Sequence, residues 1–177
     1  MKRASAVPRK PGHVARKRFG QHFLHERGVI ERIVQSINPQ PGDVIVEVGP
    51  GEGALTRALL ERVPRLDAIE IDRDLAARLA AEFPPPQLVV HVADVLEYDF
   101  SLFPEDVRVV GNLPYNISTP MLFHLGRYAA RVRDMHFMLQ LEVVERMVAK
   151  PSTPEYGRLS VMLQTRFRMQ KLFNVAA

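Results

Sequence analysis

The sequence contains no cysteine and no long apolar run. Without cysteine the chain has neither disulfides nor thiolate metal ligands, and a reducing cytoplasm is its natural location. No apolar run approaches the ~20 residues of a membrane-spanning helix, so we expect no membrane association. The chain has 177 residues, 46% of them hydrophobic, which suffices for one globular domain with a substantial core.

Acidic residues are missing from the first 18 positions, which hold seven Lys or Arg. Residues 19–106 hold 7 basic and 16 acidic residues, whereas residues 107–177 hold 10 basic and 4 acidic ones. A polyanion such as RNA is the expected partner of the basic regions, although solvated helix faces would give the same composition. Residues 1–18 resemble a mitochondrial presequence in composition, but Pro8, Pro11 and Gly12 would break its helix. We therefore predict a flexible basic arm over residues 1–18, followed by one folded domain over residues 19–177.

Hydrophobic periodicity predicts alternating strands and helices. The expected helices are 28–37, 54–63, 73–83, 119–130 and 141–149, and the expected strands are 43–49, 66–72, 87–94, 107–112 and 135–140. Residues 158–167 give a mixed signal, a helix passing into a strand. Asp72 is a plausible cap for the third helix. The alternation predicts an α/β fold, a mostly parallel sheet with helices on both faces, in which ligands bind at the carboxyl ends of the strands.

Glycines follow the first expected strand in the stretch EVGPGEG, which contains Glu47, Gly49, Gly51 and Gly53. Such glycines let a ligand approach the backbone closely, although a turn without a ligand would look the same. The second strand ends in Glu70, which could accept hydrogen bonds from both hydroxyls of a ribose. The spacing G-x-G-x-G lacks the pyrophosphate signature of dinucleotide enzymes and favours S-adenosylmethionine. The alternative for Glu70 is a solvated loop acid.

The third and fourth expected strands end in Asp94 and Asn112. Asp94 is placed to accept a hydrogen bond from an adenine amine, or else to cap a turn. Asn112 opens the stretch Asn112-Leu113-Pro114-Tyr115, for which the alternative is a satisfied asparagine and a core tyrosine in a tight turn. His22 and His25 lie three residues apart without an evident third ligand, so we expect no metal site.

Several of these stretches together resemble one protein family. RKRFGQHFL, VEVGPGEGALT, IEIDRDL, GNLPYNISTPMLFHL, DMHFMLQLEVVERM and YGRLSV resemble the KsgA-type ribosomal RNA adenine dimethyltransferases from about residue 15 to the end. The related Erm-type large-subunit enzymes usually have isoleucine where Leu113 stands. The resemblance implies a Rossmann-like class I S-adenosylmethionine-dependent methyltransferase fold.

The resemblance also implies residue roles. Gly49 would line the methionine part of the cofactor, Glu70 the ribose and Asp94 the adenine amine, with Gly51 and Asn112 also at the site. His22, which is asparagine in many members, and Leu24 would close over the cofactor. The Asn112 amide oxygen and the carbonyl of Leu113 or Pro114 would hold the exocyclic nitrogen of a target adenine, on which Tyr115 would stack.

The resemblance implies methyl transfer to two adjacent adenosines of small-subunit ribosomal RNA by a cytoplasmic monomer. Two alternatives remain open, an RNA-binding ribosome-assembly or transcription factor that keeps the fold, and an Erm-type large-subunit enzyme. In the family a further hairpin and a small helical domain follow the stretch that matches LFNVAA. We expect this chain to lack both.

Overall fold

The computed structural model describes residues 26–175. The arm expected over residues 1–18, together with His22, Leu24 and His25, lies outside this range. The strands are β1 (Ile45–Val48), β2 (Leu66–Glu70), β3 (Leu88–Val92), β4 (Val107–Asn112) and β5 (Val132–Met138). The helices are α1 (Arg27–Ile37), α2 (Ala54–Leu60), α3 (Arg73–Glu82), α4 (Tyr115–Leu125), α5 (Leu141–Val148) and α6 (Arg158–Gln164), with short 3₁₀ turns η2 (Phe100–Leu102) and η3 (Gly126–Tyr128).

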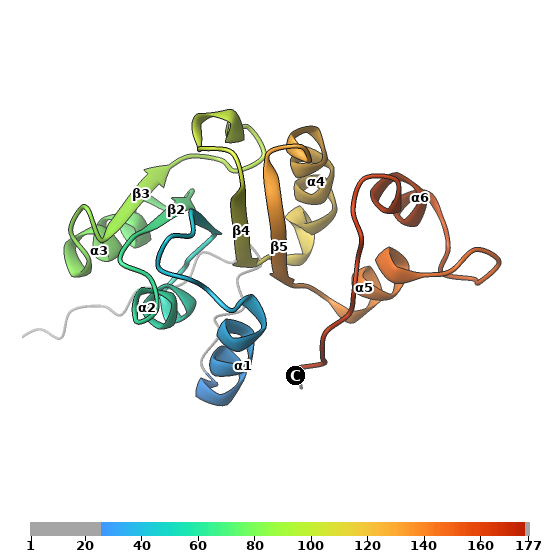
Figure 1. Cartoon of the computed structure of the whole chain (residues 1–177), viewed down its shortest axis with the longest axis horizontal. Helices are drawn as coiled ribbons and strands as arrows, with labels where there is room; N and C mark the ends of the chain where they lie inside the picture. The colour runs from blue at the N-terminus through green and yellow to red at the C-terminus, as the bar shows by residue number, and fades with distance from the viewer. Residues whose placement is uncertain (1–25, 176–177) are drawn as a thin grey trace, which may run out of the picture.

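All four strand pairings are parallel, and the strand order is β3-β2-β1-β4-β5 (Figure 1). The order reverses between β1 and β4, because the chain moves outward to β3 on one side and to β5 on the other. In sheets of this kind the ligand crevice lies at that reversal, beyond the carboxyl ends of the strands. The fold therefore confirms the predicted parallel sheet, and the reversal of strand order puts the expected ligand position beside β1 and β4.

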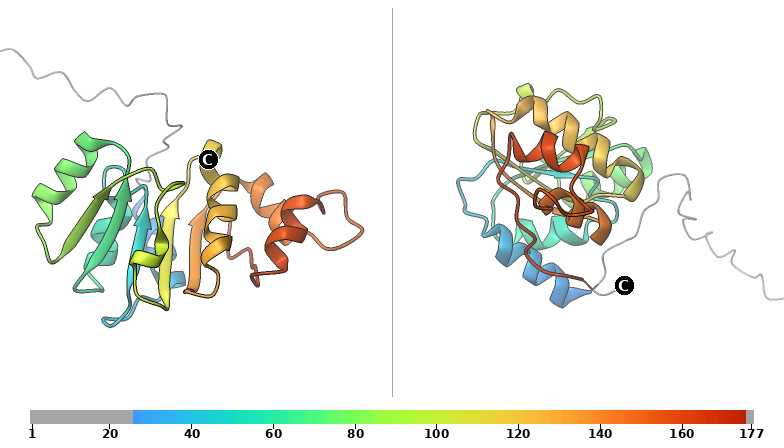
Figure 2. Two further views of the ribbon diagram at one scale, coloured as in Figure 1. Left: turned by 90° about the horizontal axis from the view of Figure 1, so that it is seen from above. Right: turned by 90° about the vertical axis from the view of Figure 1, so that its right-hand side faces the viewer.

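Alternate residues of the strands contribute to two hydrophobic cores, one on each face of the sheet. Helices α1, α2 and α3 cover one face, and the core there includes Ile37, Leu59, Leu66, Leu79 and Val110. Helix α4 and the segment after β3 cover the other face, where the core includes Val48, Ile69, Phe100, Val109 and Met121. Figure 2 shows α5 and α6 beyond the β5 edge of this layered arrangement. Helices on both faces were predicted and are confirmed.

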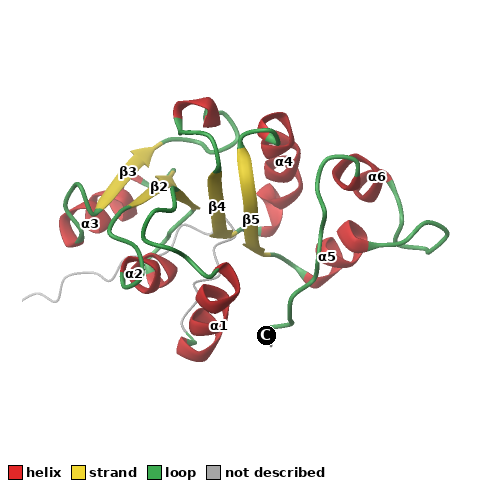
Figure 3. Ribbon diagram, in the orientation of Figure 1, coloured by secondary structure: helices red, strands yellow, loops and turns green. Residues whose placement is uncertain are grey.

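Several elements differ from the sequence-based expectation; β5, for example, was expected over residues 135–140 and begins three residues earlier, at Val132. Helix α4 begins at Tyr115 rather than at residue 119, because Pro114, with φ −62° and ψ 148°, is the N-cap and its carbonyl accepts the first helical hydrogen bonds. The strand expected at the end of residues 158–167 does not form. Helix α6 ends at Gln164, and residues 165–175 contain no strand (Figure 3). A cavity of about 740 Å³ separates residues 166–175 from β5.

Candidate active site at the carboxyl ends of the strands

The turn after β1 is shaped by glycine. Gly49, Gly51 and Gly53 have φ angles of 63°, 58° and 82°, in the left-handed region that favours glycine. Within residues 26–175, and apart from its chain neighbours, no atom lies within 4 Å of the position that a Cβ at Gly49 would occupy, so the described residues leave space on that side of the turn. A Cβ at Gly53 would lie 2.5 Å from Leu79 Cδ2, so a larger residue would have to displace that side chain in addition to adopting a φ of 82°. The turn thus combines an open side with a closely packed one.

Glu70 ends β2 and holds this turn. Its Oε2 accepts the Gly51 N–H at 3.1 Å and its Oε1 accepts the Asp72 N–H at 2.9 Å. The residue is only 1% exposed, so the solvated-acid alternative is wrong. Burial raises the pKa of Glu70, and its two backbone hydrogen bonds oppose that rise. A carboxylate has about four acceptor positions, so further donors such as ribose hydroxyls are chemically compatible with both bonds.

Glu47 is a second buried acid beneath the same turn, and sequence reasoning gave it no role. It lies in the central strand β1, is 2% exposed, and accepts a 2.7 Å hydrogen bond from Thr56 Oγ1 of α2. Burial raises the pKa of Glu47 to about 7, the Thr56 bond lowers it, and the charge of Glu70 raises it. Its position inside the apolar run VIVEV was the signal that could have revealed it. Two buried carboxyls at one turn favour a cationic ligand group.

Asp94 follows β3 and is half-buried. Its Oδ1 accepts the Leu96 N–H at 2.9 Å, which makes it a turn cap. The turn-cap alternative for Asp94 is therefore confirmed. It does not exclude a ligand, because a carboxylate that accepts one hydrogen bond retains further acceptor positions. Asp72, the predicted cap of α3, accepts the N–H groups of Asp74 and Leu75, which confirms that prediction.

Asn112 is the last residue of β4, and it lies beside the glycine turn because β4 pairs with β1. Gly111 is in register with Val48, so Asn112 lies one residue beyond the end of β1. Leu113 donates its N–H to the Met138 carbonyl at 3.1 Å, which anchors the turn to β5. Tyr115 is 61% exposed, so the core-tyrosine alternative is wrong and its ring is accessible.

The carbonyl groups of Leu113 and Pro114 differ in the hydrogen bonds that they accept. The Pro114 carbonyl accepts the N–H groups of Ile117 and Ser118, both at 3.2 Å, and the Ser118 hydroxyl at 2.9 Å. Within residues 26–175, the Leu113 carbonyl accepts no such turn or cap hydrogen bond. Of the two acceptors expected from the sequence, the geometry therefore favours Leu113, because Pro114 is occupied by the start of α4.

A Rossmann-like parallel sheet with a glycine turn, a buried acid after β2 and polar residues after β3 and β4 defines the fold of S-adenosylmethionine-dependent methyltransferases. A profile of the family described as "Ribosomal RNA adenine dimethylase" matches residues 12–177. The chain belongs to this family.

Two curated relatives, both named "Ribosomal RNA small subunit methyltransferase A", illustrate the similarity. The protein from Thiobacillus denitrificans is 60% identical over 163 residues, which cover 92% of this chain and 64% of that protein. The protein from Bordetella pertussis is 60% identical over 164 residues, covering 93% of this chain and 62% of that protein. The chain thus spans less than two thirds of the length of these relatives.

Two solved structures have a similar fold. A dimethyladenosine transferase from Plasmodium falciparum aligns with a TM-score of 0.69 at 26% identity, covering 81% of this chain and 52% of that one. The 23S rRNA methyltransferase ErmE aligns with a TM-score of 0.68 at 29% identity, covering 81% of this chain and 57% of that one.

The described residues include no helix long and apolar enough to cross a membrane.

Proposed function

We propose that this chain binds S-adenosylmethionine at the carboxyl ends of β1 to β4 and transfers methyl groups to the exocyclic amines of two adjacent adenosines in small-subunit ribosomal RNA. The observation that carries the proposal is the turn Asn112–Tyr115 placed beside the glycine turn by the pairing of β4 with β1. The relatives named as small-subunit methyltransferases at about 60% identity support the choice of RNA.

The cofactor site is assigned from the open side of the glycine turn and the acids around it. Gly49 and Gly51 would contact the methionine part, Glu70 the ribose and Asp94 the adenine amine, with His22, Leu24 and Asn112 completing the set. When bound, the cofactor supplies an electrophilic methyl group on a sulfonium. The carboxyls of Glu47 and Glu70 suit that cation, because a nearby positive charge favours the ionised form of a buried acid.

The target nitrogen needs orientation more than it needs a base. Its lone pair is delocalised into the adenine ring, which makes it a poor nucleophile. The Asn112 amide oxygen and the Leu113 carbonyl would accept its two N–H groups and so direct the lone pair away from the ring. Pro114 fixes the backbone between them and Tyr115. Hydrogen bonds that strengthen as the nitrogen becomes cationic lower the barrier without a strong base.

The exposed Tyr115 ring would stack on the target base, an interaction worth about 1–3 kcal/mol for single-stranded nucleic acid. We further propose that residues 19–177 form the catalytic part of a cytoplasmic monomer, with the basic residues 1–18 adding electrostatic attraction to RNA.

Labelled S-adenosylmethionine offered with unmethylated small ribosomal subunits tests the proposal. Label should enter small-subunit RNA as dimethyladenosine, with the complete Thiobacillus denitrificans relative as positive control. Label in large-subunit RNA alone would favour the Erm-type alternative. Binding of subunits without any transfer, in the presence of bound cofactor, would favour an assembly factor.

A further inference from the structure

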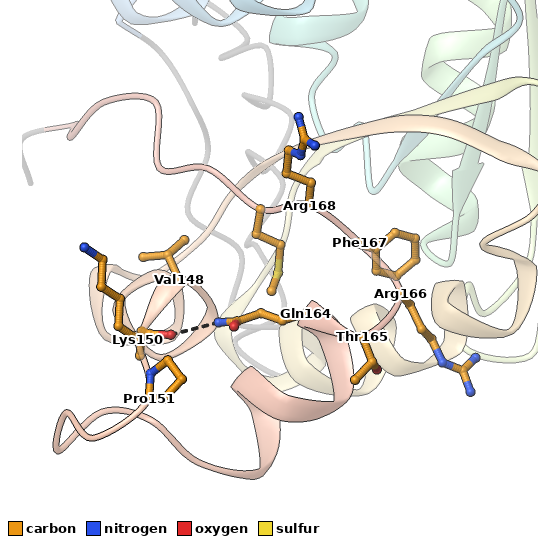
Figure 4. A pocket seen from close by; sticks show the side chains of 10 residues that line it. Val148, Lys150, Pro151, Gln164, Thr165, Arg166, Phe167 and Arg168 are labelled. Atoms are coloured by element: carbon orange, nitrogen blue, oxygen red, sulfur yellow. Dashed lines mark hydrogen bonds between the residues drawn. The ribbon is translucent and has the colours of Figure 1, made fainter.

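A groove lies between the end of α5 and the segment that follows α6. Its volume is about 560 Å³, and it is lined by residues 148–151 and 164–169 (Figure 4). Three of the lining side chains are cationic, namely Lys150, Arg166 and Arg168, and none is acidic. All three are exposed. We call this feature the basic groove.

The cations of the basic groove have no carboxylate partner among residues 26–175, unlike several arginines of the sheet. Arg108, for example, contacts Asp43 and Asp134, and Arg133 contacts Asp43. Arg166 donates one Nη1 bond of 2.6 Å to the Gly126 carbonyl, which orients its guanidinium and leaves its other N–H groups available. Unpaired cations that share one groove are suited to an anionic ligand with several charges.

The walls of the basic groove are joined by Gln164. Its Nε2 donates to the Met147 carbonyl at 2.8 Å and to the Ala149 carbonyl at 2.9 Å, which fixes the end of α6 against the end of α5. In Figure 4, Lys150 extends from one wall and Arg168 from the other, while Arg166 points away from both. The groove is therefore a built feature of two helices rather than a chance meeting of surface side chains.

The basic groove lies one helix along the chain from the candidate active site. Asn112 is in register with Met138, the last residue of β5, and the Met138 carbonyl accepts the Leu113 N–H. Residues 139 and 140 join β5 to α5, and the groove begins at Val148, the last residue of α5, so α5 connects the end of the sheet beside Asn112 to the groove (Figure 1).

We propose that the basic groove binds the phosphate backbone of RNA that flanks the target adenosine. This inference rests on the proposed function. Residues 19–106 hold 7 basic and 16 acidic residues and would repel a polyanion, so RNA should engage the half of the domain that contains α5 and α6. Arginine and lysine neutralise phosphates and release their counterions, which makes such binding strongly salt-dependent.

The test measures binding of a fluorescently labelled single-stranded RNA oligonucleotide over a series of salt concentrations. Lys150→Gln combined with Arg168→Gln removes two groove cations that make no ion pair. Arg62→Gln combined with Arg78→Gln removes two exposed arginines, outside the groove lining, with the same change in net charge. For single strands, the slope of log K against log salt is negative. It should become shallower by about 0.7 for each phosphate that the variant no longer neutralises.

We expect the groove variant to flatten the salt slope and weaken binding, and the control variant to leave the slope unchanged. Equal slopes for the two variants would overturn the proposal, because charge alone would then explain the binding. Circular dichroism and cofactor binding, measured in parallel, establish that the groove variant is folded. If RNA binding depends on the groove but no cofactor binds, the proposed function fails while the groove assignment stands.

Discussion

Gly111 of β4 and Val48 of β1 approach so closely that a Cβ at position 111 would lie 2.5 Å from the Val48 carbonyl oxygen. The two residues are in register in the parallel pairing of β1 with β4. Both flank the candidate site, since the glycine turn follows Val48 and Asn112 follows Gly111. The close approach of the two backbones therefore sets the distance between Asn112 and the glycine turn.

Gly111→Ala should separate β1 from β4 at their carboxyl ends. We expect a loss of about 1–3 kcal/mol in the free energy of unfolding, the usual penalty for overpacking, measured by urea titration. Gly28→Ala in α1 is the control, because within residues 26–175 no atom outside its own stretch of helix lies within 4 Å of its Cβ position, and alanine favours a helix. A Gly111→Ala protein as stable as the control would show that the strands adjust freely.

Asn112→Ala should abolish methyl transfer and leave cofactor affinity within about tenfold, or about 1.4 kcal/mol, of the original. The amide is proposed to act mainly on the target nitrogen, so its loss affects the transition state more than the bound cofactor. Asn116→Ala, an exposed residue on α4, is the matched control. A collapse of cofactor affinity in calorimetry would show that Asn112 acts mainly through cofactor binding and would contradict the proposed mechanism.

Glu70→Ala should weaken cofactor binding by about 1–3 kcal/mol, because the ribose hydroxyls lose their acceptor. The variant also releases the Gly51 and Asp72 N–H groups, so the glycine turn loses an anchor. Glu52→Ala, at an exposed position in the same turn, is the control for removing an acidic side chain there. Unchanged cofactor affinity by calorimetry would remove Glu70 from the site.

Glu47 should make stability depend on pH. Its pKa in the folded protein is about 7, above its ordinary value of 4.5, so the folded state holds the proton more tightly than the unfolded state. The contribution of Glu47 to the free energy of unfolding is fully present below about pH 4.5 and is lost as the pH rises to about 7. The pKa difference corresponds to about 3 kcal/mol, an order-of-magnitude figure.

Glu47→Gln keeps the size of the side chain and its acceptor for Thr56 but removes the titration. Urea unfolding at pH 5 and pH 8 should therefore show the variant gaining stability relative to the original protein as the pH rises. Glu61→Gln, at an exposed site, should show no such gain. Parallel pH dependence of the original protein and Glu47→Gln would rule out a buried, titrating Glu47.

Much of the fold could be predicted because its signals are local. The runs around Val46, Ile69 and Val109 are short and apolar, and each is followed by a turn and a helical pattern. The strand expected at the end of residues 158–167 does not form. A strand needs a hydrogen-bonded partner, and within residues 26–175 β5 pairs only with β4. Helix α4 begins earlier than expected because Pro114 is its N-cap and accepts the N–H groups of Ile117 and Ser118, which draws residues 115–118 into the helix.

The candidate site was predicted in part for a related reason. Gly49, Glu70, Asp94 and Asn112 each end or follow a strand, and parallel strands bring their carboxyl ends to one edge. Glu47 had no predicted role because its burial depends on both neighbouring strands and on Thr56, which the sequence does not place. The choice between the Leu113 and Pro114 carbonyls likewise required the start of α4.

Arg108 forms a buried network at the opposite, amino-terminal end of β4. It is 6% exposed, its Nη1 donates to Asp43 Oδ2 at 2.6 Å, and its Nε donates to Asp134 Oδ1 at 2.9 Å. Its Nη2 also donates to the Ile37 carbonyl at 2.5 Å, which ties α1 to the sheet. Burial opposes ionisation of Asp134, but interactions that include Arg108 outweigh it and lower the pKa of Asp134 to about 2.

Arg108→Met should destabilise the protein by up to about 3–5 kcal/mol, because Asp43 and Asp134 lose the cation that they share and Asp43 keeps only its contact with Arg133. Urea unfolding measures the loss, with Arg27→Met as control, since the Arg27–Glu31 pair is exposed and contributes little. The network lies at the end of the strands away from the candidate site, so the folded fraction should bind cofactor with unchanged affinity. A variant as stable as the control would show that the buried network contributes nothing net, and a weakened cofactor affinity in folded protein would show that the two ends of β4 are coupled.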